Sequence, residues 1–332
     1  MVSRLDKQSK SIHLQDVWNA QNRIQSIVSQ TPFVPSPVLG ERIGKTIHLK
    51  LENMHPTGSF KIRGAANKMM NLTDDEKSRG VTTFSTGNHG VAVAYVAKKL
   101  DIKATICISK RVPQVKVERI KRFGAEIVQI GNSQDEAADH AYELEKEHGM
   151  TVIKPFDDPH IIAGQGTIAL EMLKKVPKID TAIIQISGGG LFSGIAYVLK
   201  QINPHIKIIG VTMENSAVMY ESIQVGKPIE IDEQATLADS LLGGIGLDNQ
   251  YTFSMTKNLI DEFVLVSEEE IKEGIVYMAD QHRFIVEGAA ATGLAALMSG
   301  KGQVVGSNIA TIITGNTIDT LVFNQILQNY FN

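Results

Sequence analysis

Cysteine, net charge and long apolar runs are all scarce in this sequence, and each scarcity excludes a class of protein. The only cysteine is Cys107, so the 332 residues offer neither a disulfide framework nor a cysteine metal site. The nine histidines show no zinc-ligand spacing. A net charge of −3 gives no reason to bind nucleic acid or an anionic membrane. We expect no bound metal and no nucleic-acid partner.

No segment suggests a membrane span or a signal peptide. The longest apolar-looking stretch, 181–199, is interrupted by Gln185, Ser187 and a triple glycine. A spanning helix needs about 20 predominantly apolar residues. The first residues, 1–7, lack the apolar core of a signal peptide. We therefore expect a cytoplasmic protein with no membrane partner.

What the sequence does contain is a regular alternation of strand-like and helical patterns. The predicted strands are 81–85, 103–108 and 126–130 and, after a helix that starts near 160, 182–186, 206–211, 262–266 and 309–313. Successive strand–helix units predict parallel pairing and right-handed crossovers. The three prolines of 31–37 predict an extended segment. The whole predicts an α/β fold with two parallel sheets.

The segment richest in chemistry is Thr-Gly-Ser-Phe-Lys-Ile-Arg-Gly-Ala, residues 57–65. Helical spacing follows it, so Lys61 is predicted in the first turn of a helix with Thr57 or Ser59 as N-cap. The helix dipole and the flanking apolar residues disfavour an ammonium and favour the free amine that a Schiff-base lysine needs. The alternative, a lysine pointing into solvent, is the commoner case for an arbitrary lysine.

The sequence Ser-Gly-Gly-Gly-Leu, residues 187–191, lies between a predicted strand and a predicted helix. Consecutive glycines let backbone N–H groups approach an anion, and a helix N-terminus adds positive charge. No P-loop lysine and no Gly-x-Gly-x-x-Gly spacing accompany them, so a single phosphate monoester fits better than ATP or NAD. The alternative is a tight turn without a ligand.

Two more strand ends carry polar residues. The segment 85–90, Ser-Thr-Gly-Asn-His-Gly, could hold a carboxylate, and Asn88 could donate to a phenolic oxygen. A plain helix N-cap is the alternative. Thr314 ends the last strand, and ligands of open parallel sheets bind beyond the carboxyl ends of strands. Lys61, both loops and Thr314 all lie at such ends, which predicts one shared site.

With these motifs in this order, the chain resembles the fold-type II pyridoxal-phosphate enzymes, and among them the threonine dehydratase and serine racemase family. The resemblance extends from about Val17 to Asn316. The segments 155–159 and 243–249 are similar to those of the hydroxyectoine-utilisation dehydratases. The activity implied is that of an ammonia-lyase, which converts a β-hydroxy amino acid such as L-threonine or L-serine to a 2-oxo acid and ammonia.

The resemblance also implies a fold like that of the tryptophan synthase β subunit, with two three-layer domains built on parallel sheets. Residues 1–70 and 158–332 would form a large cofactor-binding domain, and residues 71–157 a small domain inserted in it. The implied cofactor is pyridoxal 5′-phosphate. The implied partners are an amino acid substrate and further copies of the chain, in a dimer or tetramer.

Site residues follow from the same resemblance. Lys61 would bind the cofactor as a Schiff base and remove the proton from the substrate Cα, while Phe60 would pack against the cofactor ring. Asn88 would bind the ring hydroxyl, and Thr314 would face the pyridine nitrogen. The phosphate would be held by Gly188, Gly189, Gly190 and Leu191. The substrate carboxylate would be bound by Ser85, Thr86, Gly87, Asn88 and His89.

Some positions depart from the family pattern. Thr86 stands where the dehydratases often have alanine and the serine racemases have serine, and its hydroxyl could return a proton to the second face of Cα. An amino acid racemase is therefore one alternative, and a non-catalytic relative that only binds the cofactor is another. Glu214 matches a family cation ligand, but Tyr220 replaces the aspartate that would follow, so we expect no divalent ion. Pro56 replaces an ATP-binding lysine of the racemases. Because the chain ends soon after Asn316, we expect no feedback inhibition by isoleucine through a C-terminal domain.

Overall fold

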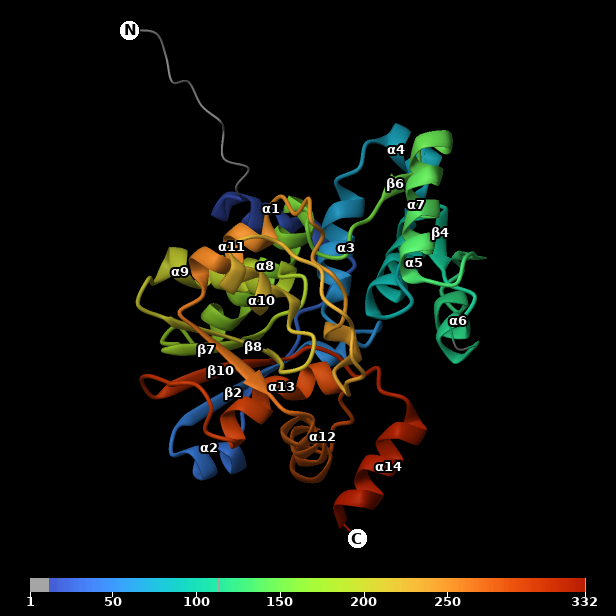
Figure 1. Cartoon of the computed structure of the whole chain (residues 1–332). Coiled ribbons are helices and arrows are strands. Elements are labelled where there is room, and N and C mark those ends of the chain that lie inside the picture. Colours follow the sequence, from blue (N-terminus) through green and yellow to red (C-terminus); the bar gives the residue numbers. More distant parts are fainter. Residues whose placement is uncertain (1–11, 113, 332) are drawn as a thin grey trace, which may run out of the picture.

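The structure is a computed structural model that describes residues 12–112 and 114–331, and its strands form two separate sheets (Figure 1). The larger sheet has the order β1 (Phe33–Pro35), β2 (Thr46–Leu51), β10 (Asn308–Ile313), β7 (Thr181–Gln185), β8 (Lys207–Met213) and β9 (Glu262–Val266). Its pairs are parallel except for β1 with β2. The smaller, all-parallel sheet has the order β5 (Glu126–Gln129), β4 (Ala104–Ile108), β3 (Val81–Thr83) and β6 (Thr151–Val152). The α/β fold with parallel sheets is confirmed.

Helices cover both faces of the larger sheet. One face packs against α1 (Leu14–Ile24), α8 (Pro159–Lys175) and α9 (Gly190–Ile202), and the other against α12 (Glu268–His282) and α13 (Gly288–Met298). The remaining helices are α2 (Pro37–Ile43), α3 (Lys61–Met70), α4 (Asp74–Arg79), α5 (Asn88–Leu100), α6 (Gln114–Lys121), α7 (Gln134–His148), α10 (Val218–Val225), α11 (Thr252–Leu259) and α14 (Thr320–Phe331), with short 3₁₀ turns at Glu52–Met54 and Asp239–Leu241.

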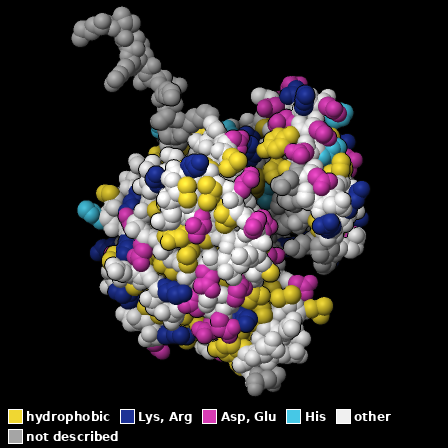
Figure 2. Space-filling model, viewed as in Figure 1, with side chains coloured by type: hydrophobic (Ala, Val, Ile, Leu, Met, Phe, Trp, Pro, Cys, Tyr) yellow, Lys and Arg dark blue, Asp and Glu magenta, His cyan; other side chains and the backbone are white. Residues whose placement is uncertain are grey.

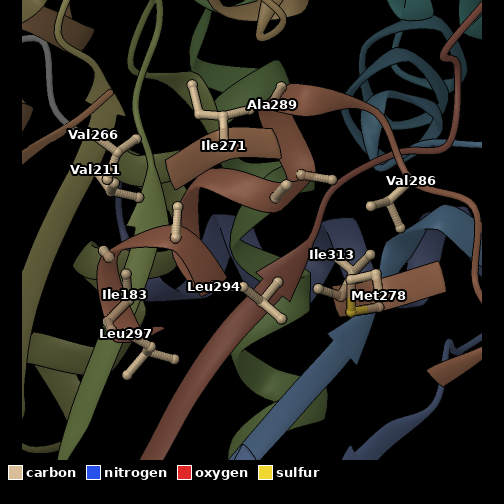
Figure 3. Packing of buried hydrophobic residues seen from close by; sticks show 14 of the residues in the cluster. Ile183, Val211, Val266, Ile271, Met278, Val286, Ala289, Leu294, Leu297 and Ile313 are labelled. Atoms are coloured by element: carbon tan, nitrogen blue, oxygen red, sulfur yellow. The ribbon is translucent and has the colours of Figure 1, made fainter. Parts of the chain in front are cut away.

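Strand periodicity divides the side chains of β7 between these two layers. Ile183 points toward α12 and α13, whereas Ala182 and Ile184 point toward α8 and α9. Figure 3 shows the first of these layers, where Ile183, Val211 and Leu294 belong to one buried cluster. Burial on both faces explains why the strands are almost continuously apolar in sequence.

The strands of the smaller sheet all fall between residues 81 and 152. That range lies inside the predicted small domain, 71–157, whose boundaries stay a prediction. Figure 2 shows a hollow between the larger part of the molecule and the smaller part. None of the helices in the described ranges is long and apolar enough to cross a membrane.

One local prediction was wrong. The prolines of 31–37 were expected to keep the whole segment extended, but Pro37 begins α2. Its ring is tolerated there because the first helical residue needs no N–H bond. Ser36 caps the helix by accepting from Leu39 N.

Candidate active site

The helix α3 begins at Lys61, beside the end of β10. Ser59 forms an antiparallel bridge with Gly315, and Phe60 N donates to Thr314 O at 3.1 Å. The predicted N-cap was wrong, because Phe60 takes that position without a side-chain cap. The bridge to Gly315 uses the backbone of Ser59, and its hydroxyl has no hydrogen-bond partner among the described residues.

The Lys61 amine donates to Pro155 O at 3.0 Å and lies 5.3 Å from the centroid of the Phe60 ring. Burial lowers the pKa of this amine to about 8, although the Glu287 carboxylate opposes the shift. The nearest hydrogen-bond acceptor is thus a neutral carbonyl rather than a carboxylate. The site favours a lysine that gives up its proton near physiological pH.

The glycine loop, residues 187–191, lies at the start of α9. Gly189 has a φ of +86°, a conformation that L side chains rarely adopt. A Cβ on Gly188 would lie 2.3 Å from a ring atom of Phe156, and a Cβ on Gly190 would lie 2.9 Å from Phe156 Cα. The loop therefore needs its glycines, and its N–H groups stand at the N-terminus of a long helix, where they can bind an anion.

The segment 85–89 turns from β3 into α5. A Cβ on Gly90 would lie 2.0 Å from Ser85 O, so the turn depends on this close backbone approach. Ser85, Thr86 and Gly87 are half-buried, while Asn88 and His89 are buried. The half-buried hydroxyls and the N-terminus of α5 together suit a carboxylate.

His89 is held as a neutral imidazole. Its Nε2 donates to Ile153 O at 2.8 Å. Burial, helped by the charge of Lys61, lowers the pKa of His89 to about 3. It therefore supplies no positive charge to this turn.

Asn88 is oriented by Glu287, a residue that the sequence reasoning missed. Asn88 Nδ2 lies 3.0 Å from both Glu287 oxygens, so the donor expected to face a ring hydroxyl is turned toward this carboxylate. Asn88 Oδ1 is buried without a hydrogen-bond partner in the described part of the chain. Glu287 is 2% exposed, directly precedes α13 and also accepts from Thr317 N at 3.1 Å. The signal for Glu287 in the sequence was its position directly before α13, a helix that has no charged residue.

Thr314 lies at the end of β10, as predicted, and is 2% exposed. Its hydroxyl is buried and accepts or donates no hydrogen bond within the described ranges. Buried hydroxyls are normally paired, so this atom is suited to meet a ligand. The structure thus gathers Lys61, Thr314 and Asn88 around one site.

The family's cation positions are not gathered in this way. Glu214 is exposed, and the ring of Tyr220 packs edge-on against that of Phe263 at 5.2 Å. Across residues 12–112 and 114–331 no group of three histidine, cysteine or acidic side chains could hold a metal ion.

Comparison with known proteins gives consistent results. A family model described as pyridoxal-phosphate dependent enzyme matches residues 24–315. A putative threonine dehydratase of Sinorhizobium fredii is 43% identical, over 96% of each chain. An L-threonine ammonia-lyase of Thermotoga maritima is 38% identical, over 96% of this chain and 78% of that one. The structure of maize serine racemase superposes with a TM-score of 0.90 at 34% identity, covering 96% of this chain and 98% of that one.

Proposed function

Because the chain belongs to the pyridoxal-phosphate-dependent enzymes, we propose that it is an ammonia-lyase acting on a β-hydroxy amino acid such as L-threonine or L-serine. The products would be a 2-oxo acid and ammonia. The observation that carries the proposal is the Lys61 amine. It donates to Pro155 O, and burial lowers its pKa to about 8. The racemase alternative is not favoured, because relatives that are 38–43% identical to this chain are named threonine dehydratase or L-threonine ammonia-lyase.

The residues present fit pyridoxal phosphate. The glycine loop is a cradle that a Cβ would fill, and the Thr314 hydroxyl is buried without a hydrogen-bond partner in the described chain. Lys61 is the amine that would bind the aldehyde. Gly188, Gly189, Gly190 and Leu191 would bind the phosphate. When bound, the cofactor supplies an electron sink for the bonds of the substrate Cα.

Lys61 is suited to move a proton at the substrate Cα. With a pKa of about 8, roughly a tenth of the amines are uncharged at pH 7, compared with well under a thousandth for an ordinary lysine. An uncharged amine is a base, and the apolar ring of Phe60 lies 5.3 Å from it. Lys61 is therefore the group proposed to take the Cα proton before the β-hydroxyl leaves.

The substrate carboxylate is proposed to bind at the turn into α5. The N–H groups of residues 86–89 and the hydroxyls of Ser85 and Thr86 would donate to it, and the neutral His89 would keep the site from holding a second anion. Thr314 would hold the ring nitrogen of the cofactor through a neutral hydroxyl. With a neutral partner there, the cofactor would supply a weaker electron sink, which would favour prompt loss of the β-group.

A hydroxylated acid from hydroxyectoine breakdown is the narrower form of the proposal. Its support is the similarity of segments 155–159 and 243–249 to that subgroup. The two neighbourhoods are joined in the structure, since Asp157 accepts from the backbone N–H groups of Gln250, Tyr251 and Thr252 at 2.8–3.0 Å. Because Asp157 neighbours the Phe156 ring, we propose that residues 243–252 line the pocket for the substrate side chain and set its specificity.

We also propose that the enzyme is a cytoplasmic homo-oligomer, a dimer or a tetramer. The support is α14, a helix with no charged residue on which Leu321 is 79% exposed and Phe331 is 64% exposed. Light scattering would give the mass of the assembly. A monomer at all concentrations would contradict the proposal.

A substrate screen tests the main proposal. Each β-hydroxy amino acid is incubated with the holoenzyme, and the 2-oxo acid is measured together with the configuration of the remaining substrate. We expect 2-oxo acid from at least one L-amino acid and a loss of more than about 10³-fold in Lys61→Ala. Full turnover in Lys61→Ala would refute the role of Lys61. Formation of the D-isomer without 2-oxo acid would favour the racemase, and bound cofactor without any product would favour the non-catalytic relative.

A further inference from the structure

Arg63 follows Lys61 by two residues on α3 and is 1% exposed. Nε and Nη2 donate to the two oxygens of Glu52 at 2.7 and 2.9 Å. Nη1 and Nη2 donate to Glu171 at 2.7 and 2.9 Å, and Nη1 also donates to Thr167 Oγ1 at 3.1 Å. All five N–H donors are used, and two carboxylates bind the guanidinium in the paired geometry that fixes an arginine firmly.

We call Lys50, Glu52, His55, Arg63 and Glu171 the Arg63 cluster. Lys50 is fully buried and donates to Glu171, and His55 Nε2 lies 3.0 Å from Glu52. Burial alone would raise the pKa of Glu52 and lower that of Arg63, but their mutual attraction reverses both shifts. The Arg63 guanidinium and the Glu52 carboxylate therefore stay charged in the fold.

The Arg63 cluster joins β2, α3 and α8, two residues along α3 from Lys61. Glu52 follows β2, Arg63 lies on α3 and Glu171 lies on α8. The same two helices also meet where a Cβ on Gly164 would lie 2.7 Å from Gly64 Cα. Arg63 and Gly64 are thus adjacent fixed points that prevent the first turn of α3 from rotating or sliding.

We propose that Arg63 is a positioning residue, which sets where the Lys61 amine lies in the site without itself touching cofactor or substrate. The inference rests on the proposed role of Lys61 as the cofactor-binding lysine. The charged and titratable groups that face the amine are Glu287, ahead of α13, and His89, on α5. Neither belongs to the Arg63 cluster, so the cluster acts on the amine through the backbone of α3.

The test uses the double variant Arg63→Met/Glu171→Gln. It removes one positive and one negative charge, so the net charge of the cluster does not change, and it leaves Lys50 facing Glu52 at 3.7 Å. Replacing a buried ion pair by uncharged side chains of similar volume is often neutral for stability. The variant is therefore expected to fold, which circular dichroism and urea unfolding would check.

The readout is attachment of pyridoxal phosphate to Lys61 in protein freed of cofactor. The amine and the aldehyde join with loss of one water, and borohydride reduction then fixes the product on its lysine for peptide mass analysis. We expect labelling of Lys61 to slow by roughly 100-fold, the usual cost of a misplacement of about 1 Å. The pH midpoint of labelling should also rise, because a displaced amine is less buried.

Lys68→Met is the matched control. It removes an ion pair near the far end of α3, where Lys68 lies 2.7 Å from Asp158, the N-cap residue of α8. Its labelling rate and midpoint should equal those of the wild type. A folded double variant that also labels Lys61 at the wild-type rate and midpoint would overturn the inference. Cofactor attachment and turnover at the wild-type level in Lys61→Ala would instead overturn the proposed function. The two failures are therefore distinguishable.

A second variant keeps the inference falsifiable if the double variant does not fold. Arg63→Lys retains the charge but cannot bridge both carboxylates, because an ammonium lacks the planar fork. We expect a smaller slowing of Lys61 labelling and a smaller rise of its midpoint. Labelling indistinguishable from that of the wild type would show that Arg63 sets nothing at Lys61.

Discussion

Two lysines lie eleven residues apart in this chain and in opposite surroundings. Lys50 is fully buried in a cluster where each charge meets an opposite one. Lys61 is half-buried among groups that lack partners within the described residues, such as the hydroxyls of Ser59 and Thr314. Burial lowers the pKa of both amines, and this shift is opposed by Glu52 and Glu171 at Lys50 and by Glu287 at Lys61. Satisfied buried charges indicate a structural element, whereas orphaned polar atoms indicate a ligand site.

Exchanging each lysine for methionine should separate these two roles most strongly. We expect Lys50→Met to lower the free energy of unfolding by about 3–5 kcal/mol, because it leaves buried carboxylates uncompensated. Adding Glu171→Gln should return most of that loss. Lys61→Met should keep or raise the stability and abolish turnover. Urea unfolding and 2-oxo acid assays measure both effects, and equal destabilisation by the two single variants would contradict the comparison.

A smaller effect is expected in the glycine loop. Gly188→Ala places a Cβ 2.3 Å from the Phe156 ring, so the loop or the ring must move, at a cost of about 1–3 kcal/mol. Affinity for pyridoxal phosphate should fall roughly tenfold or more, measured by fluorescence titration. Gly244→Ala is the control, because nothing lies within 4 Å of its added Cβ. Unchanged affinity in Gly188→Ala would separate the loop from the phosphate.

The pH dependence of stability should distinguish the wild type from Lys61→Met. The pKa of Lys61 is about 8 in the fold and 10.5 unfolded, so unfolding takes up a proton between these values. Wild-type stability relative to the variant should therefore rise as the pH increases from 8 to 10.5. Paired urea unfolding series measure the difference. A flat difference would mean that the Lys61 amine is not desolvated.

The smallest effect is expected at Thr314. Thr314→Val removes a buried hydroxyl that has no partner in the described chain, so the cofactor-free protein should gain up to about 1 kcal/mol. Turnover should fall a few-fold, since the ring nitrogen would lose its polar neighbour. A loss of stability in thermal unfolding would show that the hydroxyl is satisfied within the protein.

The sequence predicted those parts of the fold and site that depend on local pattern. The parallel strands follow from apolar runs separated by helical spacing, and the place of Lys61 in the first turn of α3 follows from the residues around it. Ser59 was wrongly expected to cap α3 because its bridge to Gly315 depends on a strand far along the chain. Glu287 was missed for the same reason, since its contacts with Asn88 and Thr317 exist only after folding.

The chain returns from the smaller sheet to the larger one through residues 153–158, and this connection contacts His89, Lys61 and the glycine loop. Ile153 O accepts from His89, Pro155 O accepts from Lys61, and the Phe156 ring packs on the glycine loop. A rearrangement there would reach the proposed carboxylate turn and the proposed phosphate cradle together. Affinity for the amino acid and affinity for the cofactor would then be linked, and each ligand would change the affinity for the other by the same factor.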